Sequence, residues 1–377
     1  MRYFLIAGEA SGDLHGSNLM KALRSIDSAA EFVFLGGDLM KAVGGTQVKD
    51  YREMAFMGIV NVVKNLGKVL RNFRDCENAL LEAKPDVVVL IDYPSFNLRV
   101  AKWVKSHLNI PVYYYIAPKL WAWKSWRIKS IKRYVDEMFT IFPFETQYFA
   151  SKGYPVHYVG NPIVDTVSNY RNQHGTPPRT QTIALLAGSR RQEIKGCLLT
   201  MVEAAHQFPD YGLVVTMAPS IEESFYREIL ADYPGVALTR NTYDAVATAA
   251  AAVVNSGTAT LETALLRTPQ VIVYHVIGGR FASLLRRILI KIPHISLVNL
   301  ISGKETAKEL IAHHFTKENI VCELNTILHD KRSREQMLID YDEIADKLGS
   351  PGTAQRASKA LLDALKTNIV SKEEKNQ

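Results

Sequence analysis

Residues 87–92 read Val-Val-Val-Leu-Ile-Asp, and this stretch decides the fold class. An unbroken apolar run that ends at a polar residue is typical of a strand buried on both faces, as in parallel sheets. Similar runs recur along both halves of the chain with helix-like segments between them, which predicts doubly wound parallel α/β sheets. The other predicted strands are residues 3–7, 32–35, 112–116, 137–141, 182–186, 212–216, 251–254 and 270–274.

The strand pattern stops and starts again, which predicts two domains in the 377 residues. The Pro-rich stretch Gly175-Thr-Pro-Pro-Arg separates the two runs of strands. We expect an N-terminal Rossmann-like domain at residues 1–164 and a C-terminal one at residues 165–345, facing each other across a cleft. We expect residues 346–377 to form a charged helical segment that packs either on the N-terminal domain or on a partner subunit.

The composition favours anionic binding partners but does not identify which one. Lys and Arg number 45 against 38 Asp and Glu, a net charge of +7, which suits nucleotides, phosphorylated sugars, anionic lipids or nucleic acid. Cys76, Cys197 and Cys322 lie far apart, so we expect no disulfide framework and no metal. No stretch approaches the roughly 20 apolar residues that span a bilayer, and no secretory signal is evident, so we expect a cytoplasmic protein.

Two turns of the second half have the composition of phosphate-binding loops. Gly188-Ser189-Arg190 follows a predicted strand and precedes a predicted helix, whose free amides, together with the arginine, can donate to a phosphate. Asn255-Ser256-Gly257-Thr258 repeats this logic, and Glu262 lies one helical turn further on, where it can accept from ribose hydroxyls. The alternatives are a plain turn with a surface arginine and a glutamate that offsets the helix macrodipole.

Two strand ends of the first half carry candidate residues. Asp92 is flanked by apolar and aromatic residues, which can raise the pKa of a carboxyl and make it a general base, although an aspartate there can also be a turn cap. Gly8-Glu9-Ala10-Ser11-Gly12-Asp13 lacks the spacing of a dinucleotide-binding fingerprint. It suits a tight turn that lines the cleft, with Ser11 or Asp13 as helix cap, or a capped turn without a ligand.

Two segments combine apolar residues with lysine and arginine. Residues 57–70 and 281–292 can lie in the interface of an anionic membrane, or pack on the sheets as ordinary amphipathic helices. Residues 120–127 hold three tryptophans, which can stack on a sugar, lie at a headgroup boundary or fill a domain interface.

Together these segments resemble the lipid-A-disaccharide synthase family in order and spacing, from Leu5 to about Leu310. Ala187 stands where the family often has proline, and Lys119 where it commonly has a small residue. The matching motifs are GEASGD (8–13), MGIV (57–60), IDYPSFN (91–97), YIAPKLWAW (115–123), LLAGSR with Glu193, SGTATLE (256–262) and ISLVNLISG (295–303).

The resemblance implies a GT-B fold and an inverting glycosyltransferase that needs neither a metal nor a cofactor. The donor would be UDP-2,3-diacylglucosamine and the acceptor 2,3-diacylglucosamine 1-phosphate, giving a β(1→6) disaccharide 1-phosphate and UDP. Because both sugars are lipids, it also implies peripheral contact with the anionic cytoplasmic face of the inner membrane. A homodimer stays open.

The resemblance also implies roles for single residues. Asp92 would be the base for the acceptor 6-hydroxyl, and Arg190 would be the other catalytic residue. The UDP-binding set would be Gly188, Ser189, Arg190, Ser256, Gly257, Thr258, Glu262 and Asn299. The acceptor-binding set would be Gly8, Glu9, Ser11, Gly12, Asp13, Met57 and Gly58, and the membrane-facing set Val60, Val62, Val63 and Leu66.

Three other functions compete. A UDP-sugar epimerase or another GT-B transferase would share the fold, but a soluble sugar needs no apolar segment like residues 57–70. A nucleic-acid-binding protein would gather basic and aromatic residues on one surface, whereas here the basic residues are spread along the chain or rim apolar segments. A silent sugar-nucleotide binder is disfavoured because Asp92 is present.

Overall fold

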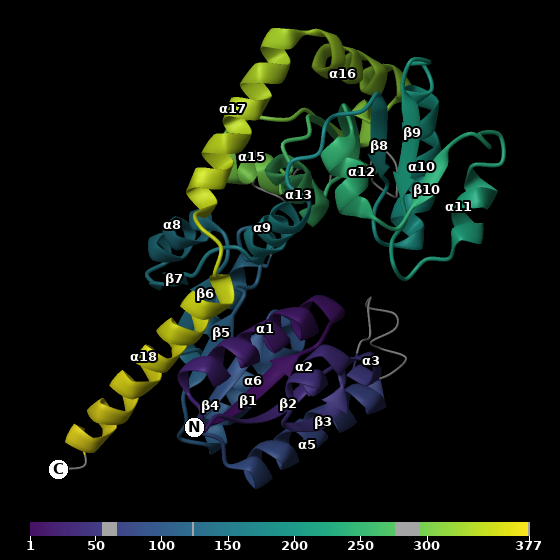
Figure 1. Cartoon of the computed structure of the whole chain (residues 1–377). Coiled ribbons are helices and arrows are strands. Elements are labelled where there is room, and N and C mark those ends of the chain that lie inside the picture. Colours follow the sequence, from purple (N-terminus) through teal and green to yellow (C-terminus); the bar gives the residue numbers. More distant parts are fainter. Residues whose placement is uncertain (55–65, 123, 276–293, 376–377) are drawn as a thin grey trace. The chain divides into compact units, whose positions relative to one another are not determined.

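The computed structural model describes residues 1–54, 66–122, 124–275 and 294–375 (Figure 1). The chain divides into two compact units, residues 1–162 with 351–377 and residues 163–350. Each unit contains one parallel sheet with helices around it, which confirms the predicted α/β class. None of the helices within the described ranges is long and apolar enough to cross a membrane.

The first unit holds a seven-stranded sheet in the order β3-β2-β1-β4-β5-β6-β7. All registered pairs are parallel. β1 and β4 are neighbours in the sheet, and the chain winds outward from this pair in two directions, through β2 and β3 on one side and through β5, β6 and β7 on the other. The strands are β1 (Arg2–Ala7), β2 (Glu31–Gly36), β3 (Thr46–Asp50), β4 (Val87–Ile91), β5 (Val112–Tyr115), β6 (Glu137–Thr140) and β7 (His157–Tyr158).

Apolar residues cover both faces of this sheet, because successive side chains of a strand point to opposite sides. Val88 and Leu90 belong to one core cluster, and Val87 and Val89 belong to the other. The helices are α1 (Ala10–Ile26), α2 (Asp38–Val43), α3 (Tyr51–Met54), α5 (Leu66–Ala83), α6 (Pro94–His107), α7 (Ile128–Tyr134), α8 (Pro143–Ser151) and α18 (Thr353–Lys375), with a 3-10 turn at Ser125–Arg127.

Helix α18 is the last element of the chain and packs in the first unit, against α1. It brings Leu361 and Leu365 into the core cluster that holds Tyr3 and Leu5. The C-terminal helix therefore completes the hydrophobic core of the N-terminal residues.

The second unit holds a six-stranded sheet in the order β10-β9-β8-β11-β12-β13. Here β8 and β11 are the central pair from which the chain winds outward. The strands are β8 (Thr182–Leu186), β9 (Gly212–Thr216), β10 (Ala237–Thr239), β11 (Ala251–Asn255), β12 (Gln270–Tyr274) and β13 (Glu309–Ile311). The helices are α9 (Pro162–His174), α10 (Arg191–Ala205), α11 (Glu223–Ile229), α12 (Thr242–Thr248), α13 (Thr258–Leu265), α15 (Leu297–Ser302), α16 (Lys317–His329) and α17 (Lys331–Leu348), with a 3-10 turn at Ala312–His314.

Candidate active site

Both sheets carry their candidate residues at a topological switch point. In doubly wound sheets, ligands bind beyond the carboxyl ends of the two neighbouring strands from which the chain winds in opposite directions. In the first unit these are β1 and β4, followed by Gly8 and Asp92; in the second they are β8 and β11, followed by Gly188 and Ser256. Topology thus singles out the same turns as the sequence motifs.

Asp92 follows β4 on a backbone that its neighbours hold fixed. Its φ angle is 44°, in the left-handed region that non-glycine residues rarely adopt and that clusters at functional sites. Its carbonyl oxygen accepts hydrogen bonds from Asn97 Nδ2 at 2.7 Å and Tyr114 Oη at 2.5 Å, and its amide donates to the Tyr115 carbonyl at 3.2 Å. These bonds fix the backbone without using the carboxylate.

The surroundings of Asp92 favour a proton-accepting role. Burial raises the pKa of its carboxyl, while the charge of Lys119 and a hydrogen bond from the Tyr93 amide lower it. A raised pKa makes the ionised carboxylate a stronger base. Lys119, the departure from the family pattern, is thus the cation that favours the ionised form.

The turn after β1 lies directly against the residue that follows Asp92. A Cβ atom added to Gly8 would lie 2.2 Å from Cδ1 of the Tyr93 ring, so only glycine fits there. The Tyr93 hydroxyl donates to the Met54 carbonyl at 3.1 Å. Glu9 is partly buried, and its charge, after burial, raises the pKa of Tyr93. Gly8 and Glu9 therefore border the Asp92 turn.

Asp13 has a different task from the one expected. It is 3% exposed, and its carboxylate oxygens accept hydrogen bonds from the amides of Gly37 at 2.8 Å, Leu39 at 3.1 Å and Met40 at 3.0 Å. These amides belong to the start of α2, so Asp13 caps α2. The expectation that Ser11 or Asp13 caps their own helix was wrong, because α1 starts at Ala10 with no side-chain cap. Ser11 is exposed and Gly12 is buried.

The turn after β8 is closed by a glutamate with no predicted role. Glu193 Oε2 accepts the amides of Ser189 at 3.0 Å and Arg190 at 3.3 Å, and Oε1 pairs with Arg190 Nη1 at 2.8 Å. A Cβ atom on Gly188, whose φ is 120°, would lie 2.7 Å from the same carboxylate. The amides of Ser189 and Arg190 are thus engaged, contrary to the expectation of a free helix start, while Arg190 itself stays exposed.

The turn after β11 has no glutamate bound to its amides in the described part of the chain, unlike the turn after β8. Gly257 precedes α13 and supplies no side-chain cap, and both Gly257 and Thr258 are exposed. The Ser256 amide donates to the Val273 carbonyl at 2.8 Å. Glu262 accepts a hydrogen bond from the Tyr243 hydroxyl at 2.9 Å; burial raises the pKa of Glu262 and this bond lowers it. A helix start with exposed residues is a ready anion site, and Tyr243 joins it as a residue that the motifs did not reveal.

The side chain of Asn299 forms hydrogen bonds to other residues of the second unit. It is fully buried, and its Nδ2 donates to the Ala307 carbonyl at 2.8 Å and to Glu309 Oε1 at 3.0 Å. Its Oδ1 accepts the amides of Thr306 and Ala307. The side chain therefore ties α15 to the segment that enters β13.

Several predicted residues lie outside the described ranges. These are Met57, Gly58, Val60, Val62, Val63, Trp123 and the apolar segment 281–292. Leu66 is the first residue of α5.

A buried glutamate organises the tryptophan-containing loop. Glu145, 1% exposed, accepts Trp121 Nε1 at 3.1 Å and the Phe142 amide at 3.2 Å. Burial raises its pKa to about 7, against the lowering effect of these bonds and of Lys119. The Tyr148 hydroxyl adds a bond to the Leu120 carbonyl at 3.0 Å. Trp121 is therefore anchored inside the first unit, whereas Trp126 is 66% exposed.

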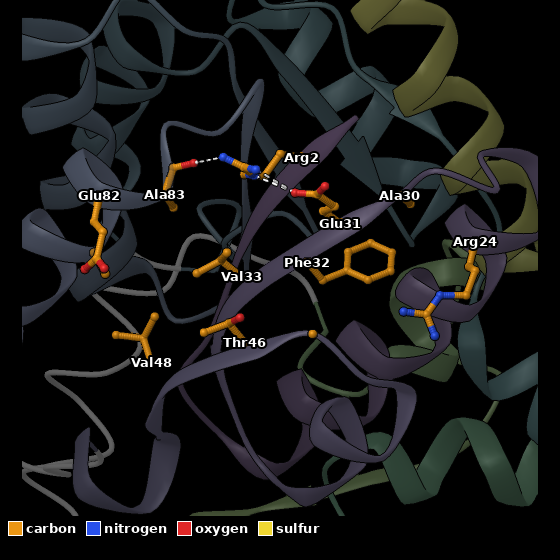
Figure 2. A pocket seen from close by; sticks show the side chains of 12 residues that line it. Arg2, Arg24, Ala30, Glu31, Phe32, Val33, Thr46, Val48, Glu82 and Ala83 are labelled. Carbon is orange, nitrogen blue, oxygen red and sulfur yellow. Dashed lines mark hydrogen bonds and ion pairs between the residues drawn. The ribbon is translucent and has the colours of Figure 1, made fainter.

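Two further observations concern metal ligands and a cavity away from the candidate site. Within the described ranges no three His, Cys, Asp or Glu residues gather in a way that could hold a metal ion. A cavity of about 530 Å³ lies at the amino ends of β1, β2 and β3, where Arg2 pairs with Glu31 and bonds the Ala83 carbonyl (Figure 2). That edge is opposite the switch point, so this cavity is not part of the candidate site.

Solved structures share the fold of this chain. The UDP-GlcNAc 2-epimerase of Neisseria meningitidis bound to UDP-GlcNAc matches 97% of this chain and 100% of its own, with a TM-score of 0.60 at 13% identity. A structure titled as the S. aureus MnaA–UDP complex covers 98% and 96% with a TM-score of 0.64 at 13% identity. The glycotransferase of kitacinnamycin covers 97% and 99% with a TM-score of 0.59 at 14% identity. The chain has the GT-B fold of these proteins, as the resemblance implied.

Sequence relatives then decide the family. A model of the lipid-A-disaccharide synthetase family matches residues 3–362. The lipid-A-disaccharide synthase of Syntrophus aciditrophicus (strain SB) is 39% identical over 375 residues, covering 96% of this chain and 97% of its own. That of Myxococcus xanthus (strain DK1622) is 37% identical over 379 residues, covering 97% of each. The chain belongs to the lipid-A-disaccharide synthetase family and is a glycosyltransferase that forms the lipid A disaccharide, so the likeness to epimerases is one of fold.

Proposed function

We propose that the chain joins UDP-2,3-diacylglucosamine to 2,3-diacylglucosamine 1-phosphate with inversion at the anomeric carbon. The products are the β(1→6) disaccharide 1-phosphate and UDP. The observation that carries the proposal is Asp92, a carboxylate at the switch point of its sheet, on a fixed backbone and with a raised pKa. A group of this kind can take a proton from an attacking hydroxyl.

In the proposed step the acceptor 6-oxygen forms a bond to the anomeric carbon of the donor. The bond from that carbon to the UDP oxygen breaks, UDP leaves with the electron pair, and the hydroxyl proton moves to Asp92. Arg190 and the start of α13 stabilise the charge that develops on UDP, as preorganised donors do. Neither a metal nor a cofactor enters the proposed step.

The proposed UDP site is built on the second unit. Gly188, Ser189 and Arg190 form one wall and Ser256, Gly257 and Thr258 the other, since β8 and β11 are neighbours. Glu262 keeps one carboxylate oxygen for a ribose hydroxyl, because the Tyr243 hydroxyl occupies the other. Solved proteins of the same fold that hold UDP or UDP-GlcNAc support the binding of UDP by this chain. We leave Asn299 out, because its side chain is already fully engaged.

The proposed acceptor site is built on the first unit. Gly8 and Glu9 border the Asp92 turn, and Ser11, Gly12, Met57 and Gly58 complete the set as a family-based assignment. We leave Asp13 out, because both its oxygens cap α2.

We also propose that the enzyme works at the cytoplasmic face of the inner membrane, with Val60, Val62, Val63 and Leu66 towards the lipid. Support comes from the described start of α5, where Leu70 is 56% exposed beside the exposed residues Lys68, Arg71 and Arg74. An apolar group among cations suits an anionic interface. Sedimentation with anionic vesicles tests this: Leu70→Glu should weaken binding, and unchanged binding would count against the surface.

The reaction itself is tested with purified protein in mixed micelles. The donor is supplied with and without the acceptor, and UDP and lipid products are followed. UDP that appears only with the acceptor, together with a disaccharide 1-phosphate, is the expected result. UDP released without acceptor would indicate hydrolysis, and an altered donor sugar without UDP release would indicate an epimerase.

A further inference from the structure

Four arginine side chains line one cavity of the second unit, at the edge of its sheet opposite the nucleotide turns. The cavity measures about 400 Å³, and its lining includes no aspartate or glutamate. Arg179 precedes β8, and Arg334 donates to the carbonyl of Ala250, just before β11. Arg171 and Arg267 complete the set. We call this cavity the arginine pocket.

Backbone carbonyls hold the arginines in place. Arg179 donates to the carbonyls of Val246 and Ala249 around the end of α12, and to those of Leu266 and Arg267 after α13. Arg171 donates to the Leu265 carbonyl at 2.5 Å. Carbonyls at helix ends carry only partial negative charge, so they orient a guanidinium without neutralising it. The pocket is thus positively charged, with Arg171 and Arg179 tied to the backbone by hydrogen bonds.

Few carboxylates balance this charge. Asp342 pairs with Arg267, and Asp244 accepts the Tyr170 hydroxyl at the pocket wall. Within the described ranges no carboxylate pairs with Arg171, Arg179 or Arg334. Burial, followed by the charges of Arg334, Arg267 and Arg171, lowers the pKa of Arg179 to about 10. Like charges held together are costly, and a bound anion relieves that cost.

Hydrogen-bond donors are left over as well. Arg171 bonds only through Nη2 and Arg334 only through Nη1, so in the described part of the chain their remaining nitrogens have no acceptor. The planar fork of a guanidinium matches the oxygens of a phosphate. Charge, donors and space therefore point to the same kind of ligand.

We propose that the arginine pocket binds a phosphate-bearing anion, as a second site separate from the nucleotide turns. The ligand is a phosphate or pyrophosphate group, carried either by a soluble compound or by a lipid headgroup. Both sources present the same oxygens to the guanidinium groups.

The test uses Thr176, an exposed residue of the pocket lining that takes no part in the arginine contacts described above. Thr176→Glu puts a carboxylate into the pocket, and Thr176→Gln is the neutral control of the same size. Binding of pyrophosphate is measured by calorimetry and thermal unfolding, with UDP present to fill the nucleotide turns. Wild type and Thr176→Gln should bind pyrophosphate, and Thr176→Glu should bind it at least tenfold more weakly. Without anion, Thr176→Glu should unfold at a higher temperature than Thr176→Gln.

A second arm separates the two sources. The same proteins are sedimented with phosphatidylcholine vesicles that contain phosphatidic acid, and with pure phosphatidylcholine vesicles. A loss of binding to the acidic vesicles in Thr176→Glu alone identifies a lipid headgroup, and an effect limited to pyrophosphate identifies a soluble anion. Equal behaviour of the two variants towards both probes, or no binding of either probe by wild type, overturns the proposal. UDP binding should be the same in all three proteins.

Discussion

Asp13 and Asp92 follow neighbouring strands of one sheet, yet the protein uses them differently. Three backbone amides of the α2 start occupy the carboxylate of Asp13. Around Asp92 the neighbours bind the backbone carbonyl and amide, and the carboxylate, which accepts a hydrogen bond from the Tyr93 amide, lies in a desolvated place beside the charge of Lys119. A carboxylate with both oxygens engaged holds the fold together, whereas one on a fixed backbone is equipped for chemistry.

The second unit repeats this contrast. Both polar ends of the Asn299 side chain are used by the segment that enters β13. Glu262 has a single described partner, the Tyr243 hydroxyl. Burial follows the same division, because Asp13 and Asn299 are buried whereas Asp92 and Glu262 are only partly buried.

The largest effect is expected for Asp92→Asn. The asparagine side chain cannot take the proton of the acceptor 6-hydroxyl, so kcat should fall by about 10²–10⁴-fold, the usual contribution of a general base. The melting temperature should change little, because Asn97 and Tyr114 bind the backbone carbonyl and the asparagine oxygen can still accept from the Tyr93 amide. Asp363→Asn, at an exposed site on α18, is the matched control and should keep wild-type turnover.

Glu145→Gln should change how stability depends on pH. The pKa of Glu145 rises from 4.5 to about 7 in the folded protein, which corresponds to about 3 kcal/mol. Because the folded-state pKa is the higher one, this contribution is present below pH 4.5 and is lost as the pH rises to about 7. The melting temperature of the variant relative to wild type should therefore increase across this window. A difference that is constant with pH would contradict the burial of an ionisable group here; the exposed Glu228→Gln is the control.

Asp13→Asn should lower stability rather than turnover. Asparagine keeps one acceptor oxygen but loses the charge and one set of bonds to the α2 amides, so the free energy of unfolding should fall by about 2 kcal/mol. Urea unfolding measures this, and kcat per folded molecule should stay within about twofold of wild type. A large loss of kcat with unchanged stability would place Asp13 with Asp92 and remove the contrast.

Tyr243→Phe should have the smallest effect. It deletes the hydroxyl that donates to Glu262, a bond worth about 1 kcal/mol, so UDP affinity should fall about fivefold. Calorimetry with UDP measures it. An unaltered affinity would separate Glu262 from the UDP site.

Sequence patterns were sufficient for the central strands and insufficient at the sheet edges. The runs 182–186 and 270–274 are strands with the expected limits, since an unbroken apolar run has few alternatives in a buried layer. β3, β7, β10 and β13 were missed, because they are the edge strands of the two sheets, are at most partly apolar and, apart from β3, have only two or three residues. Their pairing with a neighbour defines them, and a single sequence does not display pairing.

The same limit applies to the site. The position of Asp92 at a strand end leaves a sequence signal, whereas its place at the switch point depends on the strand order, which the structure supplies. The cap that Asp13 provides depends on an amide 24 residues away, and the anchor of Trp121 on a glutamate also 24 residues away. The capping role of Glu193 could have been predicted from the sequence, because a glutamate three residues after the helix cap is a known capping pattern.

The most direct test of the account is the pH dependence of kcat for wild type and Asp92→Asn at saturating concentrations of both substrates. A general base must be ionised, and burial raises the pKa of Asp92. Wild-type turnover should therefore fall as the pH drops, with a midpoint above the ordinary pKa of an aspartate, and the residual turnover of the variant should not show this step. If Asp92→Asn kept the same acid limb, another group, with Glu145 the first to examine, would be the one that titrates, and the proposed base would be wrong.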